Sequence, residues 1–372
     1  MKLKNTYVLS ITALLIIIFA FIFTSCTAKV TQEDAAADEE TQSGDALPGG
    51  EEEYPEDTEE IPEEPSKPEF VGKLTGLETT EELSNIRPVA IMINNIKVAT
   101  PQQGISQADV IYEVLAEGGI TRLLCLFTDY ATLPETGSIR SSRDYYIDLS
   151  DAHDAIYVHC GGSPAAYETL SARKTENMDG ISFNTPFYRN EWRKKNMGME
   201  HSMMTTGDLL VKGIQQKGYR TTSDADQPLE FAEKDAAIGG EDASRMTLKY
   251  SYYATSVFKY DDEKKVYMKE QYGAPHIDSN NNEQLSFKNV LVLFCSHSGV
   301  LDSSGRIAVY FTGEGEGYYM SDGEYKKIKW TKQSRTSPYT LYEEDGSTEL
   351  VLNPGKSYIG IAPTGSDVNF EA

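Results

Sequence analysis

The chain has 372 residues, a formal net charge of −24 and four cysteines. This length allows more than one domain, and the excess of acidic residues argues against nucleic acid as a partner. The cysteines show no Cys-x-x-Cys spacing, so neither a zinc site nor a disulfide framework is predicted. We expect no metal ion and no other cofactor.

The N-terminus has the features of an export signal. Two lysines precede an apolar run over residues 7–23, which is the order typical of a secretory signal peptide. The next residues, Phe23-Thr24-Ser25-Cys26, resemble a lipobox, where a lipid is attached to the cysteine before cleavage. We predict a signal peptide over residues 1–25, a lipidated Cys26 and an extracytoplasmic protein anchored in the cell membrane. The alternative is an uncleaved helix, although roughly 17 apolar residues are near the lower limit for spanning a membrane.

Residues 31–69 consist mainly of Glu, Asp, Ala, Pro, Gly and Ser. They include 16 acidic residues and one lysine. A segment with so few large apolar side chains cannot bury enough surface to offset the entropy lost on ordering. We therefore predict a disordered acidic linker over residues 26–69, extended by its own charge repulsion. The alternative is an acidic tail that binds cations or a partner.

Strand-like and helix-like segments alternate in the next part of the chain. Apolar runs predict strands at residues 88–93, 120–128 and 155–160. Capping patterns and apolar periodicity predict helices at residues 106–118, 141–152 and 205–217, and a further helix that begins at Ser163-Pro164. This alternation predicts an α/β domain with a mostly parallel sheet over residues 70–240.

Beyond residue 240 the pattern changes to short alternating segments separated by turns. Strands are predicted at residues 248–253, 257–260, 266–270, 290–294, 307–311, 318–320 and 358–361. The sequence therefore predicts a mostly antiparallel β (α+β) domain over residues 241–372. The glycine-rich segment 313–317 contains two carboxylates that would repel a phosphate, and a hairpin turn is predicted there.

The loops that follow the predicted strands of the α/β domain contain candidate binding residues. Ligands of open α/β sheets bind where the carboxyl ends of strands meet helix N-termini. Arg140 and Arg143 flank the predicted N-terminus of helix 141–152, where a positive charge is unfavourable. Two guanidinium groups and free N–H groups there would bind a carboxylate or phosphate. The alternative is that both arginines pair with acidic residues such as Glu113 and Glu117.

Two further features point to the same loops. Gly161-Gly162-Ser163 would provide a second open helix N-terminus, although such a segment is also typical of an ordinary turn. His159 and His201 are the histidines best placed for this crevice, and a neutral histidine can act as a general base or a ligand. The absence of His-x-x-x-His spacing argues against a metal role for them.

Several long motifs resemble those of the YerB-like bacterial lipoproteins, a family with tandem N- and C-terminal domains of unknown function. The motifs are RPVAIMINN (87–95), PQQGISQADVIYE (101–113), EGGITR (117–122), GSIRSSR (137–143), HCGGSP (159–164), Asn289-Val290, Gly313-x-Gly315, Trp330 and NPGKS (353–357). The resemblance covers nearly all of the chain after the linker and implies an exported, lipid-anchored protein. The site that it implies consists of Asn95, Glu113, Glu117, Arg122, Arg140, Arg143, His159 and His201. The family normally has Pro-His-Asn where this chain has Glu200-His201-Ser202.

Three functions follow as hypotheses. The leading one is a protein that binds an anionic or glycan component of the cell envelope. Its ligand-binding residues would be Asn95, Arg122, Arg140, Arg143 and Ser163. The first alternative is a cell-envelope hydrolase in which His159 or His201 activates water with the aid of Glu113 or Glu117. The second alternative is a scaffold that binds another exported protein.

Overall fold

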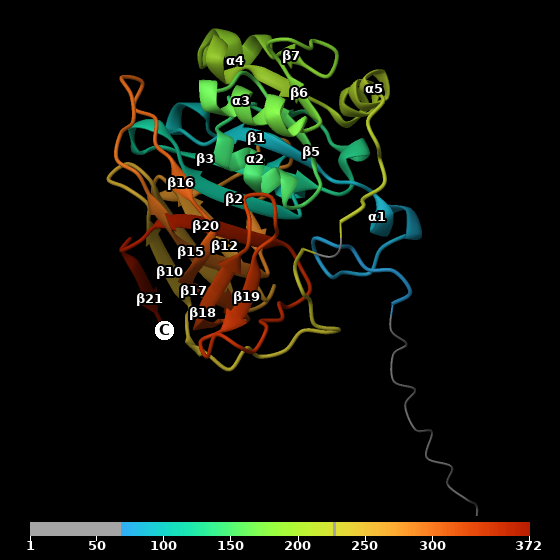
Figure 1. Cartoon of the computed structure of the whole chain (residues 1–372). Coiled ribbons are helices and arrows are strands. Elements are labelled where there is room, and N and C mark those ends of the chain that lie inside the picture. The colour runs from blue at the N-terminus through green and yellow to red at the C-terminus, as the bar shows by residue number, and fades with distance from the viewer. Residues whose placement is uncertain (1–67, 226–227) are drawn as a thin grey trace, which may run out of the picture. The chain divides into compact units, whose positions relative to one another are not determined.

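The computed structural model describes residues 68–225 and 228–372 (Figure 1). The predicted signal peptide, Cys26 and the predicted acidic linker up to residue 67 lie outside the described residues. No helix within the described part of the chain is long and apolar enough to cross a membrane. The described residues belong to one compact unit.

A mixed twelve-stranded sheet contains strands from both halves of the chain. The first half contributes β1 (Val89–Asn94), β2 (Val110–Leu115), β3 (Thr121–Phe127), β5 (Ile156–His159) and β6 (Asn177–Asp179). The second half contributes β9 (Glu241–Asp242), β15 (Asn289–His297), β16 (Val309–Tyr310), β17 (Gly313–Ser321), β18 (Glu324–Lys332), β19 (Thr340–Glu343) and β20 (Ser357–Pro363). The order is β19-β18-β17-β15-β20-β2-β3-β1-β5-β6, with β16 paired to β15 and β9 paired to β18.

The first half has the predicted α/β class. Its helices are α1 (Glu81–Asn85), α2 (Asp144–Asp151), α3 (Pro164–Arg173), α4 (Glu191–Asn196) and α5 (Gly207–Lys217). Its short 3-10 helices are η1 (Lys97–Ala99), η2 (Ile105–Gln107), η3 (Glu117–Gly119), η4 (Tyr130–Thr132) and η5 (Met199–His201). Strand β1 pairs in parallel with β5, and β5 with β6, whereas β3 is antiparallel to both β1 and β2. The sheet is therefore mixed, with several parallel strands.

Two smaller sheets complete the architecture. One consists of β4 (Thr136–Gly137), β8 (Met203–Thr205) and β7 (Tyr188–Arg189). The other is six-stranded and consists of β10 (Arg245–Lys249), β11 (Thr255–Asp261), β12 (Val266–Gln271), β13 (Ala274–Pro275), β14 (Ser286–Phe287) and β21 (Val368–Glu371). All its pairings are antiparallel, so the prediction of a mostly antiparallel second half is confirmed.

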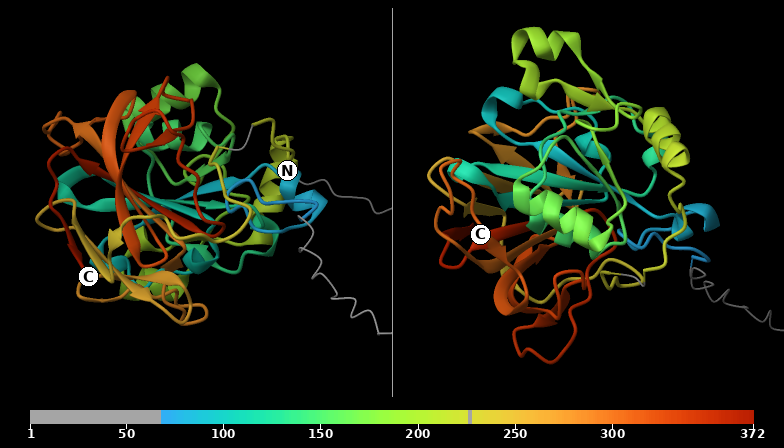
Figure 2. Two further views of the ribbon diagram at one scale, coloured as in Figure 1. Left: turned by 90° about the horizontal axis from the view of Figure 1, so that it is seen from below. Right: turned by 45° about the horizontal axis from the view of Figure 1, so that its top comes forward.

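Strand β20 joins the two halves. It pairs in parallel with β15 on one side and with β2 on the other. The first-half strands and the orange and red strands of the second half consequently lie side by side in Figures 1 and 2. The division into domains at residues 70–240 and 241–372 stays a prediction.

The predicted helix over residues 106–118 is wrong, because this segment forms η2 and then strand β2. All six residues of β2 are buried, since both faces of the central sheet are covered. A short continuous apolar run does not distinguish a buried strand from a buried helix. Ser106 does not cap a helix either, because its N–H and hydroxyl both donate to the Asp278 carboxylate at 2.9 Å.

The start of the next helix was also predicted incorrectly. The N-cap of α2 is Arg143, without a capping side chain, and not Ser141. Residues 141 and 142 instead continue as an extended segment, in which Ser142 N–H donates to the Gly161 carbonyl at 2.8 Å. Arg140 therefore lies outside the first turn of α2.

Residues 313–317 form the first part of β17 and not the predicted hairpin turn. Their glycines serve close packing. A Cβ atom at Gly315 would lie 2.5 Å from the indole ring of Trp330, and one at Gly317 would lie 2.3 Å from the Val292 carbonyl oxygen. Alternate glycines thus allow neighbouring strands and a tryptophan ring to approach the β17 backbone.

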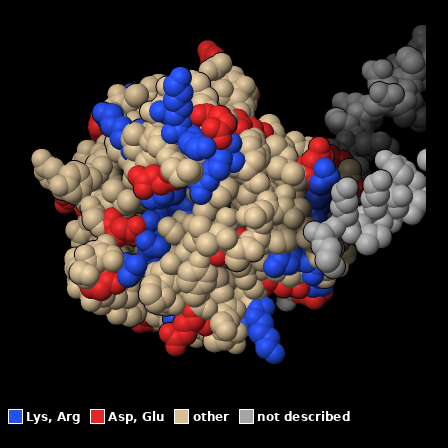
Figure 3. Space-filling model, turned by 90° about the horizontal axis from the view of Figure 1, so that it is seen from above, with Lys and Arg blue, Asp and Glu red and all other residues tan. Residues whose placement is uncertain are grey.

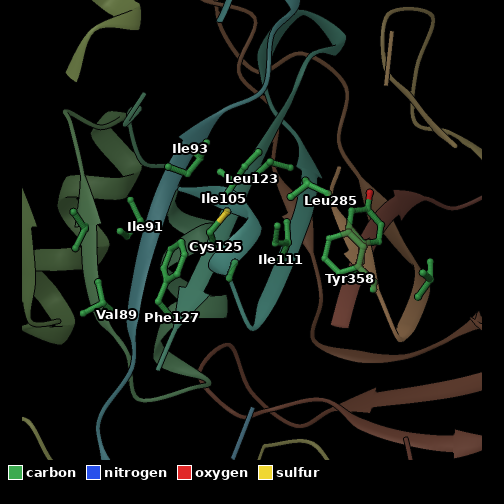
Figure 4. Packing of buried hydrophobic residues seen from close by; sticks show 14 of the residues in the cluster. Val89, Ile91, Ile93, Ile105, Ile111, Leu123, Cys125, Phe127, Leu285 and Tyr358 are labelled. Carbon is green, nitrogen blue, oxygen red and sulfur yellow. The ribbon is translucent and has the colours of Figure 1, made fainter. Parts of the chain in front are cut away.

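Side chains along β1 and β3 point alternately to the two faces of the sheet and so form two hydrophobic layers. Val89, Ile91 and Ile93 pack with Cys125 and its neighbours on one face of the sheet (Figure 4). The other face is covered by α2 and α3, which pack against each other. Burial of one such aliphatic side chain stabilises a fold by about 1.5–3 kcal/mol.

The three cysteines of the described residues are free. Cys125 and Cys295 are buried, and burial raises the pKa of each thiol. Cys160 is only partly buried.

Candidate functional site

Three loops meet at the carboxyl ends of the parallel strands β1, β5 and β6. The segment before α2 crosses these ends and bonds to them through its backbone. Arg140 N–H donates to the Met92 carbonyl at 3.0 Å, and the Arg140 carbonyl accepts from Cys160 N–H at 3.0 Å. This backbone pairing fixes the position at which the Arg140 side chain leaves the sheet.

A shallow hollow of about 450 Å³ lies at this edge. It is lined by Ile139, Arg140, Cys160, Ile181, Arg189, Gly198, Met199 and Glu200. Figure 3 shows the molecule from the side on which α3, α4 and β7 lie in Figure 1, and groups of Lys and Arg side chains stand among Asp and Glu there. Among the predicted site residues, Arg140 lines this hollow.

Arg140 has an incompletely used guanidinium group. Its Nη1 donates to the Glu200 carbonyl at 3.0 Å, while its buried Nε has no hydrogen-bond partner among the described residues. The Glu200 carboxylate lies 4.0 Å from Nη1, and the Glu200 side chain is 66% exposed. An exposed pair at this distance contributes little, so the Arg140 fork remains open to another acceptor.

Arg189, at the end of β7, supplies a second guanidinium group to the hollow. Its Nη1 donates to the Met199 carbonyl at 2.6 Å, and within the described ranges it has no carboxylate partner. Cys160 lines the same hollow. Burial raises the pKa of its thiol, while the charges of Arg189 and Arg140 both act to lower it. Both positive charges therefore act on the same small region.

Arg143 and Arg122 are committed to one carboxylate. Arg143 donates to Glu117 Oε2 from Nη2 at 2.6 Å and from Nε at 3.1 Å. Arg122 Nη2 bonds to Glu117 Oε1, and its Nη1 donates to the Ser141 carbonyl at 2.8 Å. For Arg143, the structure therefore shows the alternative given in the sequence analysis, which is an ion pair with an acidic residue and not a free anion-binding group.

This triad predicts a pH-dependent contribution to stability. Burial raises the pKa of Glu117, but Arg122 and Arg143 lower it by more, so it lies below its usual value of 4.5. A depressed folded-state pKa stabilises the fold above the unfolded-state pKa, and this contribution is lost as the pH falls through the folded value. Urea denaturation of the parent and of Glu117→Gln should show a difference in unfolding free energy that shrinks from about pH 6 to about pH 3. A difference that is constant over this range would contradict the assignment.

Glu113 and Asn95 lie in the core, away from the hollow. Glu113 is fully buried and accepts from Asn95 Nδ2 at 3.1 Å and from the Thr121 hydroxyl at 2.7 Å. Its other oxygen accepts from the Tyr358 hydroxyl at 2.8 Å and lies 3.3 Å from Lys269 Nζ. These partners come from both halves of the chain, so the network is an internal connection between them.

His159 is fully buried, and both of its ring nitrogens face internal acceptors. Nδ1 lies 2.9 Å from the Gly161 carbonyl, and Nε2 lies 3.2 Å from Asn177 Oδ1. Its ring also stacks on Tyr157, with 5.1 Å between centroids. These contacts give the ring a structural position beneath the loops.

His201 is also buried, and burial lowers its pKa, so the ring is neutral near pH 7. Its Nδ1 accepts from Asn94 Nδ2 at 2.7 Å, which leaves the proton on Nε2, 3.1 Å from Glu200 Oε1. Within the described residues no hydrogen bond or ion pair links His159 or His201 to Glu113 or Glu117. The acid–base pair of the hydrolase hypothesis is therefore not assembled.

Ser163 is the N-cap of α3, and its hydroxyl accepts from Ala166 N–H at 3.1 Å. The glycine loop before it is occupied by Asp179, whose carboxylate accepts from Gly161 N–H at 2.7 Å and Ile181 N–H at 3.0 Å. An internal carboxylate thus takes the place that an external anion would need. No group of three or more His, Cys, Asp or Glu side chains in the described part of the chain is arranged to hold a metal ion.

The sequence did not identify Arg189, Arg193 or Asp179. Arg193 is buried in α4 and donates to the His201 carbonyl at 2.9 Å and the Ala99 carbonyl at 2.6 Å. It therefore holds the turn that forms one rim of the hollow. A cluster of basic residues at 189–195 within an acidic chain was the available signal.

Comparisons with known proteins agree with this architecture. The family model described as the N-terminal domain of a protein of unknown function, DUF3048, matches residues 74–220, and the model of the corresponding C-terminal domain matches residues 246–359. The chain is 32% identical over 297 residues to the Bacillus subtilis protein named "Putative lipoprotein YerB", covering 78% of this chain and 85% of the relative.

A solved structure shows the same fold. The crystal structure of the YerB protein from Bacillus subtilis matches with a TM-score of 0.71 at 28% identity, over 81% of this chain and 99% of that chain. The resemblance noted from the sequence motifs is thereby confirmed. The chain belongs to the YerB-like DUF3048 family and has both of its characteristic domains.

Proposed function

We propose that the chain is a lipid-anchored, extracytoplasmic protein that binds an anionic component of the cell envelope in the hollow between Arg140 and Arg189. The predicted lipobox at Cys26 supports the location, and the relative from Bacillus subtilis bears the name of a lipoprotein. The two guanidinium groups in the hollow support the choice of an anion.

The state of Arg140 is the main support for this binding mode. A buried N–H without a partner costs about 1–3 kcal/mol, and a shift of the Arg140 side chain that brings Nε to a ligand oxygen would remove this cost. Within the described residues, the Nε atoms of Arg245 and Arg306 also lack a hydrogen-bond partner, but each arginine binds a carboxylate, at 3.2 Å and 2.7 Å respectively. Arg140 instead faces a hollow that contains a second arginine.

The rim of the hollow suits a ligand with an apolar part beside its charge. The exposed fractions of Ile181 and Met199 are 64% and 55%. A sugar ring with a phosphate or carboxylate substituent has both features, because its C–H face is apolar. An anionic glycan of the cell envelope is therefore the proposed class of ligand.

Asn95, Arg122, Arg143 and Ser163 already have partners inside the protein. We propose a supporting role for them: Arg143 and Arg122 hold Glu117, and Ser163 caps α3. Ligand binding by these four residues stays a prediction without a specific contact in its favour.

The double variant Arg140→Gln/Arg189→Gln should bind purified anionic wall polymer at least about tenfold more weakly than the parent. The loss of one hydrogen bond to a charged group costs about 1.5–3 kcal/mol, and about 1.4 kcal/mol corresponds to a factor of ten. Affinity can be measured by calorimetric titration of the full-length protein in detergent micelles.

Arg245→Gln is the matched control, because Arg245 also has an unpartnered Nε but pairs with Glu371 in the second half. It should bind the polymer as the parent does. Equal affinity of the parent and the double variant would refute the proposed role of the two arginines.

A further inference from the structure

A second hollow of about 470 Å³ lies over β15, β17 and β18. It is lined by Phe294, Glu316, Gly317, Tyr318, Lys327, Ile328, Lys329 and Glu344. None of these residues lines the hollow at Arg140. Its volume lies within the range of roughly 300–1,000 Å³ that is common for ligand pockets.

Tyr318 is a half-buried aromatic side chain that lines this hollow and contacts two other aromatic rings. Its ring lies edge-on to Phe294, with 5.9 Å between centroids, and 5.0 Å from the ring of Phe370. Phe370 in turn stacks on Tyr325 at 3.7 Å. The Tyr318 hydroxyl has no hydrogen-bond partner in the part of the chain that the structure describes. Tyr318 is therefore a supported aromatic surface whose polar end is free.

The charged residues of this hollow are balanced. The β17–β18 register places Glu316 opposite Lys329 and Tyr318 opposite Lys327. The Lys327 ammonium lies 3.8 Å from the Glu344 carboxylate, and both side chains are exposed. Among the described residues, the side chains of Glu316 and Lys329 form no hydrogen bond or ion pair. Two carboxylates and two ammonium groups give no net attraction for a polyanion, but they offer both acceptors and donors.

The backbone beneath Tyr318 is fully paired. Residues Gly317–Met320 of β17 pair with β15 on one side and with β18 on the other. An extended peptide binds to a sheet through unpaired backbone groups at an edge strand, and none is available here. A ligand in this hollow must be recognised by side chains alone.

We propose that this hollow binds an uncharged pyranose oligosaccharide. A pyranose ring has an apolar C–H face that packs on an aromatic ring and a rim of hydroxyl groups that require donors and acceptors. Tyr318 and Phe294 supply the aromatic surface, and Glu316 and Lys329 supply the polar partners. The balanced charge of the hollow favours an uncharged sugar over a charged polymer.

A soluble tetramer of β-1,4-linked N-acetylglucosamine is the probe for this site. It is titrated calorimetrically into the full-length protein. The detergent must have no sugar headgroup, because such a headgroup would compete with the probe for the hollow. The parent should show saturable binding. Tyr318→Leu, which retains an apolar side chain but loses the flat ring, should bind at least about tenfold more weakly. Glu316→Ala/Lys329→Ala changes only exposed charges and should bind about fivefold more weakly.

Tyr310→Leu is the matched control, because Tyr310 is 56% exposed on β16 and does not line the hollow. It should bind as the parent does, and so should Arg140→Gln/Arg189→Gln, so that this site and the anion site can fail separately. Thermal denaturation of each variant shows whether it is folded. Absence of binding by the parent, or unchanged affinity in both folded variants, would overturn the proposal. Tighter binding of a sulfated polymer through Lys329 would also overturn it.

Discussion

Replacement of Glu113 by alanine should destabilise the protein by about 3–5 kcal/mol. Glu113 is fully buried, and it pairs with Lys269, which is 1% exposed. Burial lowers the pKa of Lys269, while Glu113 acts to raise it. Without Glu113, the hydrogen-bond partners left to the Lys269 ammonium in the described part of the chain are neutral: Gln271 Oε1 at 3.1 Å and His276 Nδ1 at 3.3 Å. Urea-induced unfolding measures the loss of stability.

A second variant isolates the role of charge in this network. Glu113→Gln/Lys269→Met removes both charges and should recover most of the stability, because a neutral pair leaves no uncompensated ion in the core. Lys265→Met breaks the exposed pair with Asp262 and should leave the unfolding midpoint unchanged. An unfolding midpoint of Glu113→Ala equal to that of the parent would show that the buried pair does not stabilise the fold.

Replacement of Arg193 by methionine should cost about 2–3 kcal/mol and should also weaken anion binding. Arg193 is buried, and its guanidinium donates to the carbonyls of His201 at 2.9 Å, Ala99 at 2.6 Å and Pro101 at 3.1 Å. Its removal leaves buried carbonyl oxygens without donors. Because one of them belongs to the turn beside Met199 and Glu200, the rim of the hollow should lose its fixed position.

The matched control for Arg193 is Lys195→Met, on an exposed position of the same helix. It removes the same charge without removing a buried hydrogen bond. Chemical denaturation and calorimetric titration with anionic wall polymer should show both losses in Arg193→Met and neither in Lys195→Met. Equal effects of the two variants would indicate that net charge, and not the position of the rim, determines binding.

The fold class could be predicted because burial imposes regular patterns on the sequence. The apolar runs of β1, β3 and β5 predicted strands, and Ser163-Pro164 predicted the start of α3. The pattern failed at β2, where a strand buried on both faces shows no alternation between polar and apolar residues. It also failed at residues 313–317, where the glycines allow Trp330 and a neighbouring strand to approach.

The candidate site was harder to predict because charge pairing depends on residues far apart in the sequence. Arg140 and Arg143 are three residues apart, yet Arg143 binds Glu117 and Arg140 faces the hollow. The two arginines have different partners because α2 begins at Asp144, after both of them, and because η3 places Glu117 beside Arg143. The local sequence predicted neither feature. Arg189 reaches the same hollow from β7, a two-residue strand that has no clear sequence pattern.

The most direct test of anion binding at this site is NMR observation of the Arg140 Nε–H group during titration with anionic wall polymer. The resonance can be assigned by its disappearance in Arg140→Lys. Because Arg140 Nε has no partner among the described residues, an acceptor oxygen from the ligand should shift its resonance in proportion to the bound fraction. Saturable binding of the polymer with no change at Arg140 Nε–H would contradict the proposed site.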